Sequence, residues 1–203
     1  MMSRLTMRDF SGMTRGRGRL VVGAMVVSVV LGACATPPMT IDEYAEALNG
    51  ATEDYVGESQ ALSAAFQKTV EEEVAELADA GEGNLMALAT GVTSREMIQY
   101  FALLEDAMER YGKELDGMHP PVNLGELHDD YLSAIESVRI ALPETRDNVA
   151  EAHDLVGIQE AITGSGFADG QLRLQSSCLA LEEAVRAEGQ GVDLACSRPL
   201  TGG

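Results

Sequence analysis

The sequence predicts an all-α fold, an antiparallel bundle of about four long amphipathic helices. Apolar or small residues recur at steps of three, four or seven through most of residues 41–198, which is the spacing of one helix face. Strand signals are nearly absent, because the only Asn-Gly pair, Asn49-Gly50, falls inside a helical register rather than between alternating runs. Short turns between long helices place neighbouring helices antiparallel.

The first helix is predicted over residues 41–80. Thr40 and Glu43 have capping-box spacing at its start, and Gly81 and Gly83 end it. Gly57 weakens the helix interior by roughly 1 kcal/mol, so a kink or break is expected near it. The apolar stripe consists of Tyr44, Leu48, Ala51, Tyr55, Leu62, Phe66, Val70, Val74 and Leu77.

The second helix follows a longer connection, residues 81–92. Thr93 and Glu96 again have capping-box spacing, and Gly117 with the following prolines ends the helix. Its apolar stripe is Met97, Phe101, Leu104, Met108, Tyr111 and Leu115. Residues 81–92 carry apolar side chains that need cover, so they form either one short helix closing the bundle end or an apolar lip that binds a partner.

The third and fourth helices are predicted over residues 124–156 and 167–187. Asn123 is the expected cap of the third helix. Pro143 falls inside its register, so it either kinks one long helix or occupies the first turn of a new one. The fourth helix carries Leu172, Leu179 and Val185 on its apolar positions.

Residues 1–33 have the organisation of an export signal. Five arginines precede an uncharged run of 14 residues, Leu20–Ala33, which is shorter than the roughly 20 residues of a membrane-spanning helix. The run ends in Leu31-Gly32-Ala33-Cys34, which resembles the lipobox of bacterial lipoproteins. The resemblance implies cleavage before Cys34 and acyl chains on that cysteine, which anchor the protein in a membrane. The alternative is a short membrane anchor with an incidental cysteine.

The mature chain predicted by this signal is strongly acidic. Residues 34–40 form a tether, residues 41–198 the helical domain and residues 199–203 a flexible tail. The signal holds five of the 14 Lys and Arg residues and one of the 33 Asp and Glu residues. The remainder carries nine basic and 32 acidic side chains, a formal net charge of −23. Such a charge repels nucleic acid and anionic lipid, whereas a basic protein or peptide remains a suitable partner.

Two cysteines remain once Cys34 is assigned to lipid. An even pair in an exported chain indicates a disulfide, here between Cys178 and Cys196. Closing a loop of this size contributes roughly 3 kcal/mol to the free energy of unfolding.

No residue pattern indicates a catalytic, cofactor or metal site. His128 and His153 lie about 37 Å apart along an unbroken helix, and neither has the preceding glutamate of a di-iron site. His119, in a Pro-rich turn, has no partner motif. The acidic cluster at residues 71–79 lies on a straight helix, which does not supply the converging oxygens that calcium needs. The glycines of residues 164–170 lack a preceding strand and predict a helix–helix turn.

Two classes of function fit these observations. The first is a lipid-anchored, extracytoplasmic module without catalytic activity that binds a protein or peptide, on the cell membrane or on the outer membrane of a host that has one. The alternative is a bundle that binds a small ligand or cation for sensing or uptake. A large cavity between the helices favours the second class, and a filled core with an exposed apolar end favours the first.

Overall fold

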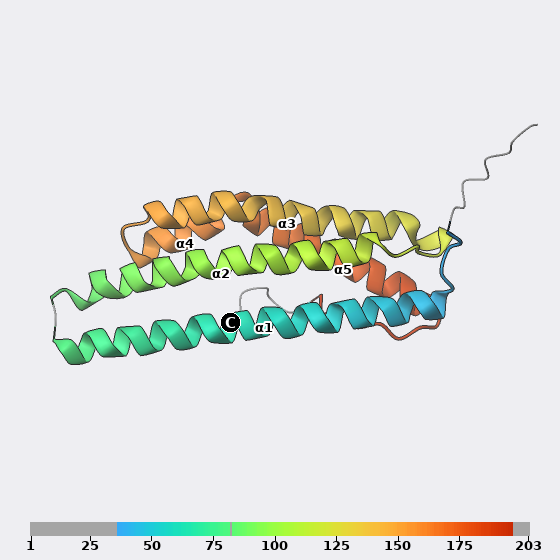
Figure 1. Ribbon diagram of the computed structural model, residues 1–203. Helices are drawn as coiled ribbons and strands as arrows, with labels where there is room; N and C mark the ends of the chain where they lie inside the picture. The colour runs from blue at the N-terminus through green and yellow to red at the C-terminus, as the bar shows by residue number, and fades with distance from the viewer. Residues whose placement is uncertain (1–35, 82, 197–203) are drawn as a thin grey trace, which may run out of the picture. The chain divides into compact units, whose positions relative to one another are not determined.

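The computed structural model describes residues 36–81 and 83–196. The described residues contain no strand and form five α-helices and one 3₁₀ turn (Figure 1). In chain order they are α1 (Ile41–Ala80), α2 (Leu85–Asp116), η1 (Val122–Leu124), α3 (Gly125–Glu151), α4 (Leu155–Thr163) and α5 (Gly166–Ala187). The predicted all-α bundle of long helices is therefore confirmed.

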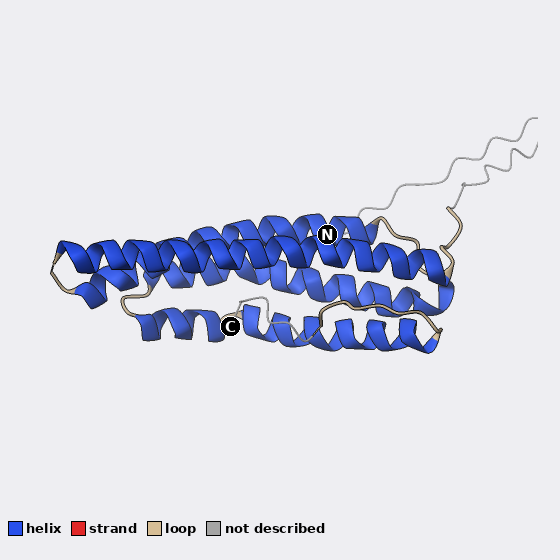
Figure 2. Cartoon of the chain, turned by 90° about the horizontal axis from the view of Figure 1, so that it is seen from below, coloured by secondary structure: helices blue, strands red, loops and turns tan. Residues whose placement is uncertain are grey.

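The helices run alternately up and down the long axis of the bundle. Helix α1 packs against α2, α2 against α3, and α3 against both α4 and α5. Helices α4 and α5 lie nearly end to end, so together they form the fourth column of an antiparallel bundle (Figures 1 and 2). None of the described helices is long and apolar enough to cross a membrane.

Helix α1 is continuous, which corrects the expectation of a kink or break near Gly57. Its start is the predicted capping box: the Glu43 amide donates to Thr40 Oγ1, and the Thr40 amide donates to the Glu43 carboxylate. Its fully buried residues all lie between Tyr44 and Tyr55. The apolar stripe beyond Tyr55 is only partly buried, because that half of α1 packs mainly against α2.

Helix α2 begins two turns earlier than the sequence predicts. Asn84 caps it by accepting a hydrogen bond from the Ala87 amide, so Thr93 lies inside the helix and does not cap it. The expected connection over residues 81–92 is therefore short, and most of it belongs to α2. Leu85 and Met86 are exposed on this first turn.

Helix α3 runs through Pro143 without a break, so of the two alternatives the one long helix is correct and no new helix begins at that proline. Asn123 does not cap the helix. Its side chain donates instead to the Glu188 carboxylate at 2.8 Å. The helix ends at Glu151 rather than at residue 156, because Asp154 accepts a hydrogen bond from the Gly157 amide and so starts α4.

Helix α5 approaches α3 closely at Gly170. A β-carbon at this glycine would lie 3.2 Å from the Cα atom of Val138, so only glycine permits this contact without a shift. The buried face of α5 differs from the predicted one, because Leu172 and Leu179 are exposed. The buried positions are Phe167, Gly170, Cys178, Leu181 and Val185.

The predicted turn at residues 164–170 is present but shorter. Gly164 ends α4, Ser165 caps α5 by accepting from the Phe167 amide, and Gly166 already belongs to α5.

Candidate functional site

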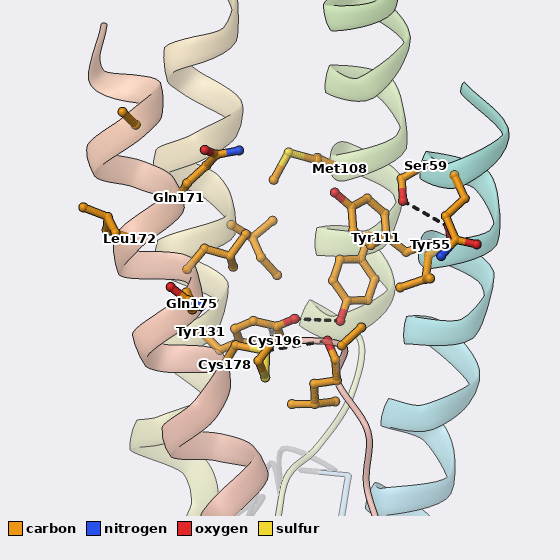
Figure 3. Close-up of a pocket in the computed structure, with 17 residues that line it drawn as sticks. Tyr55, Ser59, Met108, Tyr111, Tyr131, Gln171, Leu172, Gln175, Cys178 and Cys196 are labelled. Atoms are coloured by element: carbon orange, nitrogen blue, oxygen red, sulfur yellow. Dashed lines mark hydrogen bonds between the residues drawn. A yellow bond between two sulfur atoms is a disulfide. The ribbon is translucent and has the colours of Figure 1, made fainter. Parts of the chain in front are cut away.

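The side of the bundle between α1 and α5 is not closed by direct packing of these two helices. A cavity of about 460 Å³ lies here, between α1, α2, α3 and α5 (Figure 3). We call it the bundle cavity. Helix α1 contributes Tyr55, Val56, Ser59 and Gln60; α2 contributes Met108 and Tyr111; α3 contributes Tyr131 and Ile135; α5 contributes Ala168, Gln171, Leu172, Leu174, Gln175 and Cys178; residues 194–196 complete the wall.

Three tyrosines from three different helices form the inner wall of the cavity. The rings of Tyr55 and Tyr111 are stacked, with centroids 4.7 Å apart and planes at 9°. The ring of Tyr131 meets that of Tyr111 edge-on, at 6.3 Å and 80°. These contacts present aromatic surface to the cavity, which favours binding of a flat or apolar group.

The hydroxyl groups of two of these tyrosines are hydrogen-bonded to each other. Tyr111 Oη lies 2.9 Å from Tyr131 Oη and 3.0 Å from Thr52 Oγ1, and with its single proton it donates at most one of these two hydrogen bonds. These hydrogen bonds connect α1, α2 and α3, and Figure 3 shows the one between Tyr111 and Tyr131.

The Tyr55 hydroxyl differs from the other two. It is buried and has no hydrogen-bond partner within the described part of the chain. In Figure 3 the ring extends from α1, and the hydroxyl points into the space between the helices. Burial raises the pKa of Tyr55 above its ordinary value, so the phenol keeps its proton. An unpaired buried hydroxyl is unfavourable, and a ligand that pairs with it removes that cost.

One wall of the cavity is formed by the chain that follows α5. Residues 188–196, here named the C-terminal strap, run back along the bundle across the open side between α1 and α5 (Figure 2). Asn49 of α1 holds the strap with its amide, which donates to the Gly191 carbonyl at 3.0 Å and accepts from the Asp193 amide at 3.1 Å. Leu194, within the strap, is buried.

The strap is also fixed to α5. The Leu194 amide donates to Glu182 Oε2 at 3.3 Å, and a disulfide joins Cys178 of α5 to Cys196, with Cα atoms 5.5 Å apart. The structure thus pairs the two cysteines that the sequence predicts to be bonded. Ala195, between these attachments, has a positive φ of 55°, which is unusual for a residue with a side chain.

The side chains that line the cavity are uncharged. They are tyrosines, glutamines, one serine, the disulfide and aliphatic groups, and they include no Asp, Glu, Lys, Arg or His. Binding an ion there would remove its hydration without an opposite charge to compensate, which is strongly unfavourable. The cavity therefore favours uncharged molecules.

The three histidines do not meet. His119 and His153 are exposed, whereas His128 is buried and its Nδ1 atom lies 2.8 Å from Tyr44 Oη. Burial lowers the pKa of His128 and outweighs the opposing effect of the neighbouring Asp129.

The acidic cluster of α1 lies along the helix. Two of its members form ion pairs, Glu72 with Lys68 at 3.8 Å and Glu73 with Arg95. Among the described residues, no three His, Cys, Asp or Glu side chains are grouped closely enough to hold a metal ion.

Cys34 and the lipobox lie outside the described residues, as does the predicted tail at 199–203. The described part of the tether is attached to the bundle, because the Met39 amide donates to the His119 carbonyl at 2.7 Å.

The helical periodicity predicts Tyr55, Tyr111 and Tyr131 only as core positions. All three are buried, but they also line the cavity. The signal that could have identified them is their chemistry, since a tyrosine on a buried helix face needs a partner for its hydroxyl.

No protein-family model, no curated protein and no solved structure matches the chain.

Proposed function

We propose that this protein is a lipid-anchored, extracytoplasmic binding protein that takes a small, uncharged and largely apolar molecule into the bundle cavity. The cavity itself is the observation that carries the proposal. Its volume of about 460 Å³ falls in the range typical of small-molecule sites, roughly 300–1,000 Å³. Aromatic and aliphatic walls with a few hydroxyl and amide groups are also typical of such sites.

The charge of the chain supports an uncharged ligand. A net charge of −23 on residues 34–203 repels anions at a distance, and the lining offers no charged group to an ion of either sign. The lining groups are suited to holding and orienting a molecule rather than to moving protons or attacking it. Binding, for sensing or uptake, is therefore proposed in place of catalysis.

The anchor rests on the lipobox-like tetrad ending at Cys34. Acylation at this position would hold the binding domain against the outer face of a membrane. Apolar molecules partition into membranes, so a domain at the surface meets them at high local concentration.

The proposal is tested with an uncharged aromatic probe, 2-acetylnaphthalene, and the mature acylated protein in nanodiscs. Equilibrium dialysis against protein-loaded and empty nanodiscs separates binding to the protein from partition into lipid. We expect one saturable site per protein. Ala168→Trp, which fills the cavity, should weaken binding at least tenfold.

Ala180→Trp is the matched control, because Ala180 is exposed on the same helix and does not line the cavity. It should bind as the unmodified protein does. Absence of a saturable site, or equal binding by both tryptophan variants, would contradict the proposal.

A second candidate function is binding of a basic protein or peptide. The observation that favours it is that apolar side chains are exposed at the first turns of two helices, Leu85 and Met86 on α2 and Leu155 and Val156 on α4. Crosslinking in intact cells from a photoreactive residue at Met86 tests this candidate. A basic partner lost on Met86→Asp would support it, and no crosslinked product would argue against it.

A further inference from the structure

We infer that the ligand of the bundle cavity is an aromatic molecule carrying a hydrogen-bond acceptor, such as a carbonyl oxygen, which pairs with the hydroxyl of Tyr55. This inference rests on the proposed function and adds the chemical class of the ligand. It also gives Tyr55 a role distinct from that of the other two tyrosines.

The hydroxyl groups around the cavity are not equivalent. Tyr111 is paired on both sides, with Thr52 and Tyr131, so its oxygen has no need of a ligand. Tyr55 is stacked directly on Tyr111, yet its own hydroxyl has no partner among the described residues. Only 8% of Tyr55 is exposed, and its hydroxyl oxygen is among the buried atoms.

The direction of the hydrogen bond follows from the state of the phenol. A protonated phenol is a strong donor and a weaker acceptor. Burial raises the pKa of Tyr55, and the effects of Tyr100, Tyr111 and Glu58 act in the same direction. The complementary group is therefore an acceptor on the ligand.

The aromatic character of the ligand follows from the walls. The ring of Tyr111 lies nearly parallel to that of Tyr55 and nearly perpendicular to that of Tyr131. Met108 lines the same cavity with its thioether side chain (Figure 3). Aromatic groups gain from edge and face contacts with such rings and from sulfur contacts, beyond the area that they bury.

The test compares two ligands of nearly the same shape, 2-acetylnaphthalene and 2-isopropylnaphthalene. Only the first has an acceptor oxygen. The mature protein in nanodiscs should bind the ketone about tenfold more tightly than the hydrocarbon, since pairing a buried hydroxyl is the difference between them. Tyr55→Phe should lose this preference while binding the hydrocarbon as before.

Tyr100→Phe is the matched control, because Tyr100 is a buried tyrosine that does not line the cavity. It should retain the preference for the ketone. The thermal midpoint of Tyr55→Phe should not fall below that of the unmodified protein, because no bond of the free protein is removed. This second readout separates a lost ligand contact from a damaged fold.

The outcomes distinguish the two proposals. If neither compound binds, the proposed function fails and this inference fails with it. If the hydrocarbon binds but the ketone has no advantage, or if the advantage survives in Tyr55→Phe, only the assignment to Tyr55 is overturned.

Discussion

Among the residues that the structure describes, buried polar side chains are paired within the chain, and the hydroxyl of Tyr55 is the exception. Thr52, Tyr111 and Tyr131 bond to one another, and Tyr44 bonds to His128. Thr145 donates to the Ala141 carbonyl, as buried threonines in helices commonly do. Against this background of paired groups, an unpaired hydroxyl beside a cavity is the position where a bound molecule gains most.

The burial of His128 should make the stability of the fold depend on pH. Burial lowers its pKa below the ordinary value of about 6.5, so between these two values the unfolded chain binds a proton that the folded chain does not. The free energy of unfolding should therefore be highest above about pH 6.5. It should fall as the pH drops from about 6.5 to the lowered pKa of the folded protein. Urea unfolding at pH 7.5 and 5.5 measures the decrease.

The controls separate His128 from the other histidines. His128→Gln should show a smaller decrease over the same pH range, although its stability at pH 7.5 also falls because the contact with Tyr44 is lost. His153→Gln should keep the full decrease, since His153 is exposed. The same decrease in both variants would exclude His128 as the cause.

At the scale of single helices, replacing a glycine by alanine should have opposite effects on the free energy of unfolding at two positions. Gly50 lies in an exposed part of α1 with no atom within 4 Å of its missing β-carbon, so Gly50→Ala should raise the free energy of unfolding by about 0.5–1 kcal/mol. Gly170→Ala should lower it by about 1–3 kcal/mol, because α5 must move away from Val138 of α3. Urea unfolding of both variants checks the signs. A stabilising Gly170→Ala would mean that α5 does not approach α3 so closely.

Removing the disulfide of the C-terminal strap should have a larger effect on the free energy of unfolding. Replacing both Cys178 and Cys196 by serine should lower the free energy of unfolding by about 3 kcal/mol and increase amide exchange at Leu194. The cavity loses a fixed wall, so affinity for an aromatic probe should fall as well. Thiol counting on the denatured, unreduced protein checks the pairing itself, and two free thiols there would be incompatible with it.

The sequence predicts the all-α bundle and most of its long helices, but not the site. Local signals were correct at Thr40, where the capping box starts α1, and at Gly81, which ends it with a positive φ of 65°. They were wrong at Thr93, because the capping pattern there competes with Asn84, and at Gly57, because one glycine is tolerated in a helix that packs along its length.

The cavity depends on contacts that no local pattern contains. It exists because α1 and α5, separated by more than 80 residues, do not close against each other, and because the strap returns to cover part of that opening. Periodicity places Tyr55, Tyr111 and Tyr131 on buried faces. It does not say that these faces leave a space between them.

At the scale of the whole molecule, a highly charged exterior surrounds an uncharged cavity. Acidic side chains outnumber basic ones, and the formal net charge of −23 on residues 34–203 repels anions and anionic polymers. The cavity wall has no charged side chain. Under the proposed function these two features select neutral molecules, because the surface repels anions and the cavity has no charged group that could replace the hydration of an ion.

The same charge predicts how the domain stands on the membrane, if Cys34 carries the acyl chains. The Met39 amide is bonded to the His119 carbonyl, so the tether from Cys34 to the bundle is five residue steps long and spans at most about 18 Å. Helix α1 has 40 residues and is therefore about 60 Å long. A domain lying flat would bring many carboxylates within about 8 Å of anionic headgroups, and an upright domain avoids this.

Spin labels at Glu46 and Asp79, two exposed positions near opposite ends of α1, measure the orientation. With the protein in vesicles that contain anionic lipid, the label at residue 46 should lie near the headgroups and the label at residue 79 far from them. Cys34→Ser is the control, because it should leave an uncut precursor without acyl chains. Equal depth of the two labels would rule out the upright orientation. Both ends of a helix about 60 Å long are at the membrane surface only when the helix lies parallel to that surface.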